Sequence, residues 1–196
     1  MAATWEHLKL GRFEYAGMGW TRVVDVPAFK SFSYDTGYSN ARRSKGRHEL
    51  VFGAFDESDL PSAAEVEVAD RVLANHAALV GVVTQALWES FDGRGPGSGT
   101  YGDRATLAKS FKSHKLRPPA KAQDLLAALQ PCRILVCEAF PGHDRPMVEL
   151  QFHSAFEEEH GVSVLTDGHS VLGIGYHLDV VPFGFKPPAS PFSPFG

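Results

Sequence analysis

The stretch SDLPSAAEVEVADRVLANHAALVGVVTQALWESFDG, residues 58–93, decides the fold because it is the one strongly helical segment of the chain. Pro61 suits a first helical turn, and Ser62 with Glu65 matches a capping box, in which each side chain bonds the other residue's backbone N–H. We therefore expect a long helix over residues 62–91, in which Gly81 is where a break could occur. Seven residues recur at the spacing of one helix face: Val66, Ala69, Leu73, His76, Val80, Val83 and Leu87.

The segments on both sides of this helix are typical of β-strands, because they combine aromatic and β-branched residues and are bounded by turn residues. Before the helix these are LGRFEYAG (10–17), WTRVVDVPAF (20–29) and RHELVFGAFDE (47–57). After it come RILVCEAF (133–140), MVELQFHSAF (147–156), HGVSVLT (160–166) and HSVLGIGY (169–176), which predict an antiparallel meander.

This pattern predicts an α+β fold. An antiparallel sheet is built from the N-terminal and C-terminal strands, and the one long helix packs across a face of it. We expect residues 1–185 to form a single domain. The Pro-rich segment 186–196 is expected to be an extended or disordered tail.

Composition and charge exclude several classes of function. The formal net charge of -4 gives no long-range attraction to nucleic acid or to anionic membranes. The N-terminus shows no signal peptide, and AALVGVVTQALW is too short to span a bilayer. Cys132 and Cys137 lie too far apart along one predicted strand to form a disulfide, which fits a cytoplasmic protein. SNARRSKGR (39–47) is the only basic patch that we identify, and a nucleic-acid contact there is the weakest alternative; its cations are Arg42, Arg43, Lys45 and Arg47.

The candidate site lies in EEEHGVSVLTDGHSVLGIGYH, residues 157–177. Asp167-Gly168 between apolar residues predicts a hairpin with a two-residue type I′ turn, in which Val164 faces Val171. Alternation then places three polar side chains on one face of the open end: Glu158, His160 and His177. Two imidazoles and a carboxylate could bind zinc, iron or manganese, or act as general bases. The alternative is a polar sheet end whose acids keep it solvated.

Other catalytic signatures are absent from the sequence. The chain has no HExxH, GxSxG or CxxC motif and no dinucleotide-binding fingerprint. The Gly-rich stretch GRGPGSGTYGD (93–103) lacks the lysine of a phosphate-binding loop and follows a helix where that motif follows a strand. The sequence therefore favours a non-enzymatic role.

Three features together resemble a group of uncharacterised bacterial domains: an opening LGxF hairpin with a downstream Trp, a long helix ending near LW, and a closing EHGVSVLTDGHSVLGIG hairpin. Such domains are encountered as candidate immunity or toxin-neighbourhood proteins. The resemblance implies a cytoplasmic α+β domain that binds another protein, and it supplies no catalytic residues. The residues that carry it are Leu10, Gly11, Phe13, Trp20, Leu87, Trp88, Glu159, His160, Gly161, Asp167 and Gly168.

The resulting hypothesis is a protein-binding domain without a cofactor, of an immunity type that occludes its partner. Its binding surface would be acidic, because acids can complement a basic partner and speed association. The residues of this surface are Glu157, Glu158, Glu159, His160 and His177. The alternative is a metal-dependent hydrolase that uses Glu158, His160 and His177 with zinc, iron or manganese.

Overall fold

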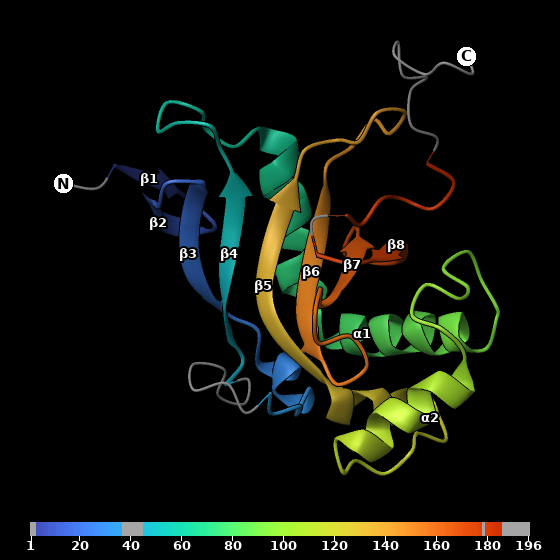
Figure 1. The fold of residues 1–196 in the computed structure, drawn as a ribbon. Coiled ribbons are helices and arrows are strands. Elements are labelled where there is room, and N and C mark those ends of the chain that lie inside the picture. Colours follow the sequence, from blue (N-terminus) through green and yellow to red (C-terminus); the bar gives the residue numbers. More distant parts are fainter. Residues whose placement is uncertain (1–2, 37–44, 178, 186–196) are drawn as a thin grey trace.

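The computed structural model of the protein describes residues 3–36, 45–177 and 179–185. Within them an eight-stranded sheet has its strands side by side in sequence order, as Figure 1 shows. Its strands are β1 (Thr4–His7), β2 (Gly11–Tyr15), β3 (Gly19–Asp25), β4 (Arg47–Gly53), β5 (Leu129–Cys137), β6 (Met147–Ser154), β7 (Val162–Thr166) and β8 (Val171–Gly175). The predicted α+β fold is confirmed. The tail 186–196 lies outside the described residues, as do Arg42 and Arg43.

The long helix α1 (Ala63–Phe91) packs against one face of this sheet (Figure 1). Its capping box forms as predicted: the Ser62 N–H donates to Glu65 at 2.7 Å, and the Glu65 N–H donates to the Ser62 hydroxyl at 3.3 Å. The helix continues through Gly81 without a break, because Gly81 costs only about 1 kcal/mol relative to alanine in a helix stabilised by packing. Among the described residues, no helix is long and apolar enough to cross a membrane.

One pair of strands departs from the antiparallel pattern. β4 and β5 are parallel, whereas every other neighbouring pair is antiparallel. A parallel pair needs a long crossover. The crossover here contains α1, the short helix α2 (Arg104–Ser113) and the 3-10 helix η2 (Ala122–Ala128). The sheet is thus two antiparallel halves joined at β4 and β5, and the carboxyl ends of these two strands lie at the same edge.

The main core lies between the sheet and α1. The fully buried side chains Phe52, Leu150 and Phe152 on the sheet belong to the same cluster as Leu79 and Leu87 on the helix. A smaller cluster of Met147, Leu165 and Val180 is separate from it. The 3-10 helix η1 (Pro27–Ser31) contributes the buried Phe29 to the main core.

Candidate functional site

The C-terminal hairpin forms, but with a different register from the predicted one. Val164 pairs with Ile174, where the two-residue turn placed Val171. The cause is the Asp167 side chain, whose carboxylate accepts from the N–H groups of His169 and Ser170, both at 2.9 Å, and so closes a longer connection. The type I′ turn was therefore the wrong prediction for this Asp-Gly pair.

The changed register separates the three predicted metal ligands. His177 Nε2 lies 3.1 Å from the Phe152 carbonyl and 3.2 Å from the Val162 carbonyl. His160 Nδ1 lies 3.2 Å from the Glu157 carboxylate. Among the described residues, no group of three His, Cys, Asp or Glu side chains could hold a metal ion. The structure thus does not bring Glu158, His160 and His177 together as one ligand set.

Glu158 turns instead toward partners that the sequence did not indicate. Its Oε1 lies 2.9 Å from His114 Nε2 and accepts from the Tyr34 hydroxyl at 3.2 Å. The hydrogen bond to the Ser110 carbonyl is the largest influence on the pKa of His114 and raises it; burial opposes this, and Glu158 raises the pKa further. These contacts join the end of α2 to the β6–β7 connection. Because they link elements that are distant in sequence, we interpret them as a structural clasp.

The predicted acidic surface is partly occupied by contacts within the chain. The side chain of Glu157 is 19% exposed, and its carboxylate accepts from the His160 backbone N–H at 3.1 Å. Glu158 is engaged by His114, and Glu159 is exposed. Two of these three carboxylates therefore already have partners within the chain.

An open pocket lies elsewhere, at the carboxyl ends of β4 and β5. It is a groove of about 470 Å³ between the β2–β3 turn, the β4–α1 loop, the start of α1 and the end of β5. Chain connections diverge at this edge, since β4 leads to α1 and β5 leads to β6; such edges are where ligands bind in open sheets that contain parallel strands. We call it the β4–β5 groove; its apolar lining residues are Met18, Ala54, Phe55, Leu135, Val136 and Cys137.

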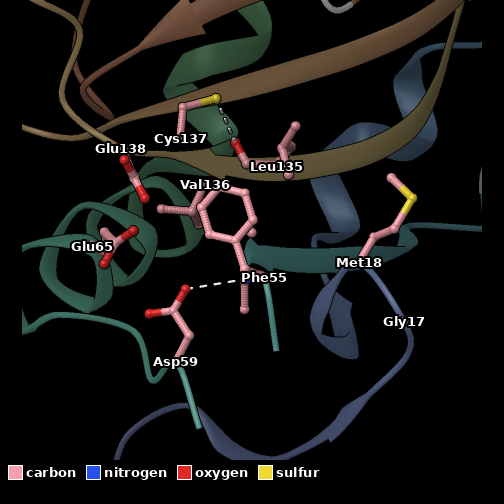
Figure 2. Close-up of a pocket in the computed structure, with 11 residues that line it drawn as sticks. Gly17, Met18, Phe55, Asp59, Glu65, Leu135, Val136, Cys137 and Glu138 are labelled. Carbon is pink, nitrogen blue, oxygen red and sulfur yellow. Dashed lines mark hydrogen bonds between the residues drawn. The ribbon is translucent and has the colours of Figure 1, made fainter. Parts of the chain in front are cut away.

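Large apolar side chains stand in solvent around this groove. Phe55 is 94% exposed, Met18 79% and Leu60 55%. Figure 2 shows the Phe55 ring in the middle of the groove, between Met18 and Glu65. Burying a phenylalanine side chain typically stabilises a protein by about 1.5–3 kcal/mol, so this exposure forgoes a substantial gain.

The β4–α1 loop is held in place by defined hydrogen bonds. The Trp20 indole N–H donates to the Asp59 carbonyl at 2.8 Å, and the Phe55 N–H donates to the Asp59 carboxylate at 3.3 Å. Asp56 accepts from the Ser58 N–H at 2.8 Å and closes a tight turn between them. Phe55 thus projects from a loop whose backbone is anchored to a buried tryptophan.

The rim of the groove is acidic. Asp59, Glu65 and Glu138 line it, and Asp56 and Glu57 are exposed on the same loop. Among the described residues that line the groove, none is lysine or arginine. A ligand seated here would meet an apolar floor surrounded by negative charge.

The Cys137 thiol at the groove is poorly suited to act as a nucleophile. Burial raises the pKa of the Cys137 thiol to about 12, so it remains protonated near neutral pH. Burial likewise raises the pKa of Cys132 to about 11. The groove offers contact surface and charge, which are the means of binding.

Sequence reasoning missed this groove because four separate chain segments form it. One local signal was available: Phe55 stands in FGAFDESDL, beyond the end of β4 and directly before an acidic turn. An aromatic residue in such a turn has no sheet face on which to pack.

The chain matches no protein-family model, and no curated protein or solved structure is significantly similar to it.

Proposed function

We propose that this chain is a non-enzymatic, cytoplasmic protein-binding domain and that it engages its partner through the β4–β5 groove. The observation that carries the proposal is Phe55, which is 94% exposed yet fixed on an anchored loop over an apolar floor. Aromatic anchors that fill pockets of a partner supply most of the binding energy of protein interfaces. Phe55 is exposed in the chain alone, and in the complex the partner covers it.

The geometry favours a protein partner over a small molecule. Small-molecule sites enclose most of the ligand's surface. This groove is open, and its most prominent side chain is almost fully in solvent. Phe55 and Met18 can instead insert into a complementary surface, while the half-buried Leu135 receives an apolar side chain of the partner.

The acidic rim specifies the charge of that partner. Asp56, Glu57, Asp59 and Glu138 surround the apolar residues, so a complementary segment carries lysine or arginine beside an apolar anchor. Rim charges of this kind increase the association rate and weaken in their effect as salt rises. An immunity-type protein that occludes a basic partner, which the resemblance of the sequence suggests, would use such a surface.

The test is a selection of random peptides displayed on phage against the full chain, followed by affinity measurements on synthetic copies. We expect the enriched peptides to carry an aromatic or aliphatic residue flanked by lysine or arginine. The double variant Phe55→Ser/Met18→Ser should weaken their binding at least about tenfold, because each anchor is expected to contribute over 1 kcal/mol. Its melting temperature should stay unchanged, since both side chains are exposed.

Leu8→Ser is the matched control, because Leu8 is as exposed as Phe55 but lies in the β1–β2 turn, outside the groove residues. It should leave peptide affinity unaltered. The proposal fails if the selected peptides show no excess of basic residues, or if they bind the double variant and the unmodified chain equally well.

A further inference from the structure

A second charged surface lies on α2 and the segment that follows it. Residues 104–123, RATLAKSFKSHKLRPPAKAQ, contain no acidic residue. Arg104 is engaged, since it pairs with Asp92 and its guanidinium carbon lies 3.5 Å from the centroid of the Trp88 ring. The other five cations are exposed, and none forms an ion pair with any residue of the described ranges. We call these five the α2 basic surface: Lys109, Lys112, Lys115, Arg117 and Lys121.

The net charge of -4 does not reveal this surface, because the acidic and the basic residues lie on different parts of the molecule. The acids of the β4–α1 loop lie at the carboxyl ends of β4 and β5, whereas α2 lies at the other end of the sheet (Figure 1). The sequence segment 39–47 is therefore not the only concentration of basic residues, contrary to the sequence-based expectation.

The acids next to α2 are turned toward the backbone. Asp103 caps the helix by accepting from the Thr106 N–H at 2.8 Å. Asp124 accepts from the N–H groups of Ala120 and Lys121, at 2.7 and 3.2 Å. At the border of the surface, Glu158 is engaged by His114, and Glu159 is exposed. The five cations are thus opposed by few free carboxylates.

Lys115 occupies a position that normally belongs to glycine. α2 ends in a Schellman motif, in which the Leu116 N–H donates to the Phe111 carbonyl at 2.8 Å and the Lys115 N–H donates to the Lys112 carbonyl at 3.1 Å. The residue at the turn has φ of 59°, and Lys115 is the one non-glycine residue of the described ranges with positive φ. A lysine there costs stability that glycine would not. In return for this lower stability, Lys115 adds one more exposed cation to the surface.

The surface presents charge without apolar contact. Leu107 and Phe111 of α2 are buried. No described residue between 61 and 180, a range that includes all of α2 and the segment after it, has an exposed large hydrophobic side chain. Protein interfaces require an apolar centre, and insertion into membranes requires apolar side chains. A nucleic-acid backbone requires only cations that neutralise phosphates. We propose that the α2 basic surface binds the phosphate backbone of nucleic acid without reading its sequence, since no exposed aromatic ring is present there to stack on bases.

The test is fluorescence anisotropy of the full chain with a labelled 20-base-pair DNA duplex, titrated between 50 and 200 mM KCl. Five phosphate contacts predict that affinity falls about 500-fold over this range. The double variant Lys109→Gln/Lys112→Gln leaves three contacts, so the fall should shrink to about 40-fold. Arg12→Gln, an exposed cation on β2, is the control and should leave the salt dependence unchanged.

Lys115→Gly gives the sharpest measurement because it should stabilise the fold while it weakens the binding of DNA. It should raise the melting temperature by about 3 °C, since glycine adopts positive φ without strain. It should also reduce the salt-dependent fall in affinity to about 150-fold, because one phosphate contact is lost.

Three results would overturn the proposal. One is a salt dependence that the Lys109→Gln/Lys112→Gln variant shares with the unmodified chain. Another is no measurable binding of the duplex at 50 mM KCl. The last is tighter binding to phosphatidylserine vesicles or to polyglutamate than to the duplex, which would assign the surface to a membrane or an acidic protein.

Discussion

His48 makes the stability of this fold sensitive to acid, and the size of the effect follows from its environment. The side chain is 6% exposed in the interior of β4, 5.8 Å from the ring of Phe29 between ring centroids. Burial lowers its pKa from 6.5 to about 4, because the charged imidazolium loses its hydration. The folded chain therefore binds fewer protons at this site than the unfolded chain does. Its contribution to stability is intact above pH 6.5 and is lost as the pH falls from 6.5 toward 4.

Linkage converts this shift into free energy. Between pH 7 and pH 5 the unfolded state gains about 2 kcal/mol relative to the folded state, and the full loss below pH 4 approaches about 3 kcal/mol. Replacing His48 with glutamine or with leucine removes the titration, so each variant should lose about 2 kcal/mol less of its unfolding free energy between these pH values.

Urea unfolding at pH 7 and pH 5 measures the difference for all three chains. The other titrating groups are common to them, so their contributions cancel in the comparison. A loss that is the same within about 0.5 kcal/mol in the unmodified chain and in both variants would show that His48 does not charge on unfolding, and would refute the reasoning.

Four further substitutions test the packing and the clasp. Gly161→Ala should destabilise the fold by more than about 2 kcal/mol in urea unfolding, because Gly161 has φ of 69° and an added Cβ would lie 2.2 Å from the His177 ring; an unchanged midpoint would contradict this. Phe52→Ala should cost about 3–5 kcal/mol and Phe55→Ala less than about 0.5, since Phe52 is fully buried and Phe55 is 94% exposed; equal losses would mean that Phe55 packs in the core. Glu158→Gln should lower the pKa of His114 in an NMR titration, because the carboxylate helps to raise it. The stabilisation from the charged pair is present below pH 6.5 and is lost as the pH rises through the raised pKa. If the substitution leaves the NMR titration of His114 unchanged, the clasp is excluded.

The sequence predicted the elements whose signals are local. The capping box at Ser62 and the helical spacing of apolar residues identified α1 almost to the residue, because both depend on neighbours along the chain. The strand segments were recognised for the same reason, apart from β1, whose four residues give too short a pattern. The helix-favouring stretch AKAQDLLAALQP (120–131) forms only the 3-10 helix η2, which passes into β5 at Leu129 because pairing in the sheet overrides its helix propensity.

Pairing and register required information from distant parts of the chain. Nothing in the β4 and β5 segments shows that they lie parallel, because period-two alternation is the same for either direction. The hairpin register failed because an Asp-Gly pair permits several turns, and the Asp167 carboxylate selects one of them through contacts that the pattern does not contain. Predicting the groove required the pairing of β4 with β5, since the groove exists only where the ends of these two strands meet.

Helix dipoles explain the position of some of the segregated charges but not of others, and the unexplained charges are the ones available for binding. Acids near the start of α1 and cations near the end of α2 both interact favourably with helix dipoles, whose effect reaches about one turn. Glu65 satisfies the first requirement and Lys112 the second. Asp56 and Glu57 precede the first turn of α1, and Arg117 and Lys121 follow the last turn of α2, so the dipoles do not account for them. Charges that neither dipoles nor ion pairs explain thus lie at both proposed binding surfaces, with opposite sign, and this separation suits two partners of opposite charge.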